Sequence, residues 1–90
     1  MSHVIVKFTG SLREYAPDGT DAPFRVEWPE DRPVEDLLKT TGVPMAMVQV
    51  VMVNNRAVPP GAAVAPGDRV CVFPVEYAFF ADWVHMRFNR

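Results

Sequence analysis

One amphipathic helical segment, with strand-like runs on either side of it, most constrains the fold of this chain. Pro33 suits the first position of a helix, because its missing N–H group would be unpaired there anyway. Gly42 suits the left-handed residue that caps a helix, so the sequence predicts one helix from Pro33 to Thr41. Its apolar side chains are spaced three and four residues apart, as on one face of a helix: Val34, Leu37 and Leu38.

Five runs of residues alternate or cluster apolar side chains in the manner of β-strands. They span residues 3–9, 24–28, 48–53, 56–58 and 69–75. The run 48–53 is nearly all apolar, which is typical of a strand covered on both faces. Within the long loop after the first strand, residues 11–15 favour one helical turn. One helix among these strands predicts an α+β fold, in which the helix covers one face of a small sheet.

Two short segments have the composition of tight turns. Asn54 and Asn55 lie between two predicted strands, and asparagine tolerates the positive φ angles of a two-residue hairpin. Gly67 and Asp68 precede the last predicted strand, where the Asp68 carboxylate can accept backbone N–H groups. We therefore predict a structural role in turns for all four residues.

The composition is that of one small domain. Its 90 residues suffice for one hydrophobic core, and a net charge of −2 with only two lysines argues against a nucleic-acid partner. No run is apolar over the ~18 residues that a membrane helix needs, and the N-terminal residues lack the pattern of a secretory signal. We therefore expect a cytoplasmic protein with neither a membrane nor a nucleic-acid partner.

The sequence contains no pattern typical of a catalytic centre and no glycine-rich motif that binds phosphates. His3, His85 and Cys71 would form a weak metal site only if folding brought them together; two surface histidines and one small buried thiol are the simpler interpretation. We therefore expect no enzyme activity, no cofactor and no bound metal. The acidic residues near the predicted helix start favour a solvated surface, with a docking patch for a basic partner as the alternative: Glu30, Asp31, Glu35 and Asp36.

Residues 76–90 are rich in aromatic side chains, with five of the ten aromatic residues of the chain. Residues from 84 onward alternate as in a strand, and a short helix over 76–83 is the alternative. Burying one large apolar side chain is worth ~1.5–3 kcal/mol, so we expect this segment to dock on its own sheet, on a second copy or on another protein. The predicted contact residues are Tyr77, Phe79, Phe80, Trp83, Val84, Met86 and Phe88.

Several short motifs occur in the order found in one family of small proteins. They are Val-Asn-Asn at 53–55, Gly-Asp-Arg-Val at 67–70 and Phe-Pro at 73–74, preceded by Val-Lys-Phe at 6–8 and PVEDLLKTTGVP at 33–44. Over residues 3–75 the chain resembles the ubiquitin-like sulfur carriers, namely the small subunit of molybdopterin synthase and the thiamine-pathway carrier. The resemblance implies a β-grasp fold, in which a mixed sheet wraps one helix and the first and last strands pair in parallel at its centre.

The chain departs from that family where the reactive tail of a sulfur carrier would be. Those carriers end in Gly-Gly shortly after Phe-Pro-Pro, and their terminal carboxylate is adenylated and converted to a thiocarboxylate. At the corresponding place this chain has Ala78-Phe79, and no two of its glycines are adjacent. The segments GVPMAMVQVVMVNN at 42–55 and VFPVEYAFF at 72–80 resemble in register the ubiquitin-like domain that precedes a PIN-like RNase domain in some bacterial proteins, and that domain also lacks Gly-Gly.

We therefore predict a β-grasp domain over residues 1–75 and a C-terminal extension over residues 76–90. The predicted function is that of a non-conjugating ubiquitin-like protein, which binds a protein partner or itself through the extension. The alternative is a sulfur carrier, or an accessory subunit, in molybdenum or tungsten cofactor biosynthesis or in thiamine biosynthesis.

Overall fold

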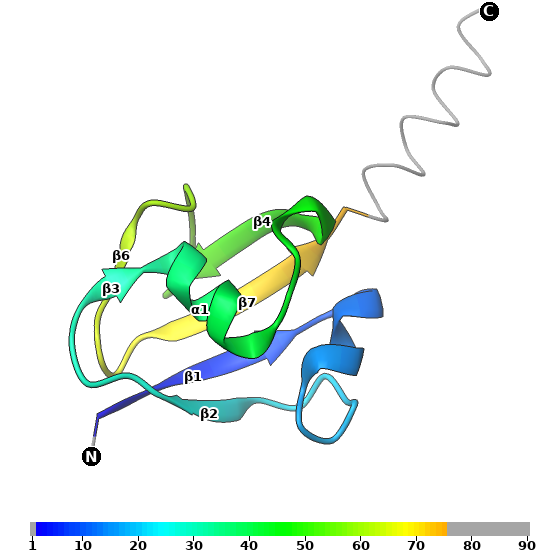
Figure 1. The fold of residues 1–90 in the computed structure, drawn as a ribbon, viewed down its shortest axis with the longest axis horizontal. Coiled ribbons are helices and arrows are strands. Elements are labelled where there is room, and N and C mark those ends of the chain that lie inside the picture. Colours follow the sequence, from blue (N-terminus) through cyan, green and yellow to red (C-terminus); the bar gives the residue numbers. More distant parts are fainter. Residues whose placement is uncertain (1, 76–90) are drawn as a thin grey trace, which may run out of the picture.

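A five-stranded sheet wrapped around one α-helix dominates the computed structural model, which describes residues 2–75 (Figure 1). The strand order of this sheet is β2-β1-β7-β4-β5, and β3 and β6 form a separate two-stranded sheet. The elements in chain order are β1 (His3–Phe8), the 3₁₀ helix η1 (Gly10–Tyr15), β2 (Phe24–Glu27), β3 (Arg32–Pro33), α1 (Val34–Thr41), the 3₁₀ helix η2 (Met45–Met47), β4 (Val48–Val53), β5 (Arg56–Val58), β6 (Ala63–Val64) and β7 (Arg69–Pro74).

The first and last strands, β1 and β7, lie side by side at the centre of the sheet and run parallel. Their register pairs Ile5 with Arg69 and Phe8 with Val72. Beyond the end of β1, the Thr9 hydroxyl donates a hydrogen bond of 2.9 Å to the Val72 carbonyl. The other strand pairs of this sheet are antiparallel. This mixed sheet confirms both the α+β class and the β-grasp arrangement that the family resemblance implies.

The hydrophobic core lies between α1 and the sheet face that α1 covers, here called the inner face. Leu37 and Leu38 of α1 are buried, and α1 lies across the middle strands in Figure 1. Trp28 is fully buried as well, and its Nε1–H donates a hydrogen bond of 2.8 Å to the Val64 carbonyl. The buried side chains of the strands are Val4, Val6, Phe8, Val51, Val53, Val64, Val70, Val72 and Pro74. The inner face therefore serves stability, since each such burial is worth about 1.5–3 kcal/mol.

The helix begins one residue later than the sequence predicts. Pro33 has φ −68° and ψ 155° and pairs with Ala63 in the two-stranded sheet, so α1 starts at Val34. The φ angle that a proline ring imposes suits a helix and an extended strand equally, so the residue type alone does not fix this boundary. At the other end, Gly42 has φ 88° and donates its N–H to the Leu38 carbonyl at 2.9 Å, which is the predicted left-handed cap.

The remaining differences from the sequence-based prediction concern boundaries and one sheet face. Strands β1, β2 and β7 each end one residue earlier than predicted, and the predicted helical turn at 11–15 is the 3₁₀ helix η1. The β3–β6 sheet was not predicted, because two-residue strands have no periodicity to detect. The prediction that β4 is covered on both faces is wrong: Val51 and Val53 are buried, whereas Val50 and Met52 are only half-buried.

The predicted strand or helix within residues 76–90 lies outside the described residues, as do the seven predicted contact residues in that segment. Within residues 2–75, no helix has both the length and the apolar character needed to cross a membrane.

Candidate functional site

The candidate site is the face of the five-stranded sheet that points away from α1, here called the outer face. Successive side chains of a strand point to opposite faces, so the residues between the buried positions lie on the outer face. Met52 lies opposite Cys71 and Val50 lies opposite Phe73, and these side chains are half-buried. With Ile5 of β1 they form the apolar stripe of this face. The stripe borders an open hollow of about 340 Å³.

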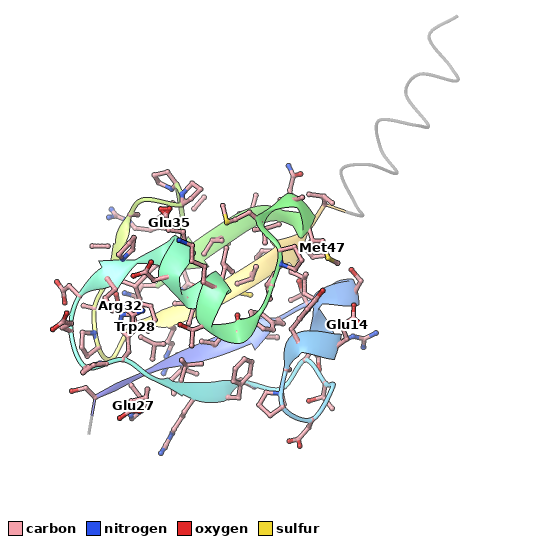
Figure 2. The ribbon with its side chains drawn as sticks, viewed as in Figure 1. Glu14, Glu27, Trp28, Arg32, Glu35 and Met47 are labelled. Carbon is pink, nitrogen blue, oxygen red and sulfur yellow. The ribbon has the colours of Figure 1, made fainter. Side chains whose placement is uncertain are left out.

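Three cations border the apolar stripe. Lys7 follows the stripe along β1, and Arg25 of β2 and Arg69 of β7 lie on either side of Ile5. All three cationic side chains are exposed. Glu27, which Figure 2 labels, is the carboxylate that β2 turns to the same face, near the start of β1. The outer face is therefore locally positive, although the net charge of the chain is −2.

Hydrogen bonds between two turns fix the position of Arg69. Asn54 and Asn55 have φ angles of 51° and 71° and join β4 to β5. The Asn54 Nδ2 donates to Asp68 Oδ1 at 3.0 Å, and the Arg69 backbone N–H donates to Asn54 Oδ1 at 3.0 Å. Asp68 Oδ2 also accepts the Ala65 backbone N–H at 2.8 Å. These contacts tie the hairpin to the start of β7 and fix the backbone from which the Arg69 side chain extends.

Cys71 lies on the outer face and is half-buried, so the interpretation of this residue as a small buried thiol is only partly correct. Burial raises the pKa of the Cys71 thiol, and the Lys7 ammonium acts in the opposite direction. At neutral pH the side chain is therefore an uncharged thiol and belongs to the apolar stripe. The sequence does not reveal this neighbour, because only the parallel pairing of β1 with β7 brings Lys7 opposite Cys71.

Acidic side chains lie on the other side of the sheet, near the start of α1. Glu35 and Asp36 occupy the first helical turn, where the helix dipole favours negative charge. Arg32 Nε lies 3.2 Å from Asp36 Oδ2, and the Arg32 guanidinium lies 4.6 Å from the centre of the Trp28 ring (Figure 2). Asp36 of the acidic cluster is thus paired with Arg32 of the same chain. This pairing disfavours the alternative of a docking patch for a basic partner.

A second apolar hollow, here called the edge groove, lies between α1 and the β5 edge of the sheet. It encloses about 260 Å³, and Gln49 supplies the one polar side chain of its lining. Met45, at 44% exposure, is the one large hydrophobic residue that is exposed within residues 2–75. The principal lining residues are Leu38, Met45, Val48, Val58, Pro59 and Pro60. Sequence analysis missed this groove because its residues come from separate elements, which only the fold brings side by side.

The residues that the sequence singled out occupy different parts of the molecule. The four turn residues lie at the β4–β5 hairpin and just before β7, and Gly67 has φ 94°. His3 lies on β1 and Cys71 on β7, whereas His85 is outside the described residues. Within residues 2–75 no three histidine, cysteine or carboxylate side chains come together in a way that could hold a metal ion.

Solved structures with the same fold include small proteins of archaea. The structure of small archaeal modifier protein 1 from Haloferax volcanii matches with a TM-score of 0.63 and 26% sequence identity, covering 82% of this chain and 98% of that chain. A structure described as molybdopterin converting factor subunit 1 from Pyrococcus furiosus matches with a TM-score of 0.62 and 27% identity, again covering 82% of this chain and 98% of that chain. These matches confirm the ubiquitin-like, sulfur-carrier-like fold that the motifs imply.

The sequence itself matches a family model over nearly its whole length. The model is described as Mut7-C ubiquitin, and it matches residues 1–79. No curated protein sequence is significantly similar to the chain. Because the family model spans the sheet, the helix and the connections between them, the chain belongs to the Mut7-C ubiquitin family.

Proposed function

We propose that this chain is a non-conjugating contact module, whose outer face binds a protein surface that combines apolar side chains with carboxylates. The observation that carries the proposal is the apolar stripe bordered by Lys7, Arg25 and Arg69 on the face opposite α1. In protein interfaces an apolar centre supplies much of the affinity, while charges at the rim steer the encounter and select the partner. Contact rather than catalysis is the activity that these residue types favour.

The residues that follow β7 support the non-conjugating part of the proposal. Adenylation of a C-terminal glycine requires a slender tail that can enter a narrow channel. After Phe73 and Pro74 this chain continues with Val75, Glu76 and Tyr77, and the bulky Phe79 follows soon after. Side chains of this size at these positions fit a segment that makes contacts better than one that is threaded into an enzyme.

The segment 76–90 is the second contact element of the proposal. Its aromatic and apolar side chains would bind a partner or the chain's own surface, since leaving them in water forfeits their burial energy. The proposed contact residues are Tyr77, Phe79, Phe80, Trp83, Val84, Met86 and Phe88.

The outer-face proposal can be tested with two synthetic peptides that share their apolar residues and differ in flanking glutamates or lysines. We expect the glutamate peptide to bind the full chain more tightly in a calorimetric titration. The double variant Lys7→Glu/Arg69→Glu should weaken this binding by roughly two- to thirtyfold, because each exposed ion pair contributes ~0.2–1 kcal/mol.

The matched control is Lys39→Glu/Arg56→Glu, which makes the same change in net charge at exposed residues away from the outer face. It should leave the affinity for the glutamate peptide within about twofold, since screening reduces distant charge effects. Equal binding of the two peptides, or equal losses in the two double variants, would refute the proposal. Single-stranded RNA serves as a second ligand: binding of RNA as tight as that of the glutamate peptide would also contradict it.

Sulfur transfer is the alternative function, and the similarity to the molybdopterin converting factor subunit favours it. It can be tested by incubating the chain with an activating enzyme, ATP and a sulfur donor, followed by mass spectrometry of the intact protein. Exchange of one oxygen for sulfur at the C-terminal carboxylate would establish the alternative. An unchanged mass, beside a known sulfur carrier that reacts under the same conditions, is the result we expect.

A further inference from the structure

We propose that the segment 76–90 folds back within the same chain and inserts an aromatic side chain, Phe79 or Phe80, into the edge groove. The inference deepens the proposed function, because it names the surface that the second contact element covers. It concerns a different face of the molecule from the outer face. An experiment can therefore refute this inference without refuting the outer-face proposal, and the reverse.

The described chain ends beside the edge groove. Val75 donates its backbone N–H to the Met47 carbonyl at 2.9 Å, and Pro74 pairs with Val48. Val48 and the nearby Met45 both line the groove, and Figure 2 labels Met47 at this corner of the molecule. The segment therefore begins next to the groove rather than across the molecule from it.

The length of the segment suits this short path. The four residues from Val75 to Phe79 reach at most about 14 Å when extended. Phe79 and Phe80 can thus arrive over Met45 and Val48 without crossing the sheet.

The chemistry of the groove matches the first part of the segment. The lining of the groove contains no charged side chain, and residues 77–81 are also uncharged. The volume of about 260 Å³ is below the ~300–1,000 Å³ of ordinary small-molecule pockets, so a side chain is the more suitable occupant. Covering Met45 would also remove the exposed large hydrophobic residue from water. The outer face, with its three cations, matches the uncharged residues 77–81 less well than the uncharged lining of the edge groove does.

Two methionines provide matched probes for the experiment, because Met45 lines the edge groove and Met52 lies on the outer face. The full chain, labelled at its methionine methyl groups, is compared by NMR with the variant Phe79→Ser/Phe80→Ser. An aromatic ring stacked on Met45 shifts the resonance of its methyl group upfield. We expect this shift in the full chain, its loss in the double variant, and an unchanged Met52 resonance in both.

Three results would overturn the inference. The first is an identical Met45 resonance in the two proteins; the second is a change at Met52 instead of Met45. The third is a Met45 shift that grows with protein concentration, which would place the segment on a second copy. Nuclear Overhauser contacts between aromatic protons and the Met45 methyl group should be present in the unmodified chain, and their absence counts against the inference even if the double variant does not fold. A dispersed amide spectrum of the variant shows that its fold is intact.

Discussion

The outer face and the edge groove both leave apolar side chains accessible, yet only the outer face surrounds them with charge. Lys7, Arg25 and Arg69 border the apolar stripe, whereas Gln49 is the one polar side chain of the groove lining. Charges act over distances of about 10 Å at ordinary salt concentrations, and apolar contacts act only on touching. A charged surface is therefore suited to a partner that must be found in solution, and an uncharged groove to one that is already nearby.

Tethering explains why an uncharged groove can still be filled. A segment attached next to its binding site has an effective concentration in the millimolar range, so even a weak apolar contact is populated. The hydrogen bond between Val75 and Met47 supplies such an attachment point beside the groove. This comparison is consistent with the two proposals, in which the groove binds a segment of the chain itself and the outer face binds other molecules.

The largest effect is expected beneath the edge groove. Leu38 is 1% exposed and belongs to the hydrophobic core, so Leu38→Ala should lower the free energy of unfolding by about 2–5 kcal/mol. On the outer face, Ile5→Ala should cost less than the ~1.5–3 kcal/mol for a fully buried side chain, since Ile5 is only partly buried. Urea unfolding measures both. Equal losses would mean that the outer face is as much a part of the core as the groove floor.

A variant in the turn next to Arg69 should change the properties of the outer face and leave the edge groove unchanged. Asn54→Ala removes the hydrogen bonds to Asp68 and from Arg69, and an alanine at φ 51° is strained by roughly 1–2 kcal/mol. We expect a loss of stability of about that size and weaker binding of the glutamate peptide, with an unchanged Met45 resonance. Asn55→Gly is the control, because glycine accepts φ 71° without strain. If Asn54→Ala leaves peptide binding intact, Arg69 takes no part in it.

Salt should distinguish the two surfaces more finely. Raising the ionic strength from 0.1 M to 1 M shortens the screening length from about 10 Å to about 3 Å. Binding of the glutamate peptide to the outer face should weaken as salt is added, and the Met45 resonance should not move. Calorimetry and methyl NMR on the same samples provide the measurements. If peptide binding did not depend on salt, the cations of the outer face would make no contribution to it.

The smallest effect concerns the titration of Cys71. Burial raises the pKa of its thiol above 9.0, so the folded chain holds this proton more tightly than the unfolded chain does. The resulting stability is fully present below the unfolded pKa and is lost as the pH rises through the folded pKa. Alkylation by iodoacetamide at pH 8 should therefore be slower than that of a free cysteine. Lys7→Ala should slow it further, because Lys7 lowers the pKa; a faster reaction would contradict this assignment.

The fold was largely predictable because its signals are local. Strand alternation and the Gly42 cap each depend on a few neighbouring residues, and together they predict the order of the elements. The start of α1 was not predictable, since the φ angle of Pro33 suits an extended residue equally well and the pairing with Ala63 decides between them. The order of the motifs then pointed to the β-grasp arrangement, which no local pattern specifies.

The candidate site was less predictable because it depends on pairing across the sheet. Lys7 and Cys71 are far apart in the sequence, and Arg25 comes from a third strand. Net charge pointed to an acidic protein, whereas the outer face gathers cations and α1 carries acidic residues on the other side of the sheet. The edge groove depends in the same way on four elements meeting.

The parallel pairing at the centre of the sheet has a consequence for synthesis on the ribosome. Thr9 and Val72, which the pairing brings together, are 63 residues apart in the chain. While the growing polypeptide emerges, β1 has no central neighbour until β7 has been made, and closing so long a loop is slow. We therefore expect this domain to remain unfolded until nearly all of it has left the exit tunnel, and then to fold in one step.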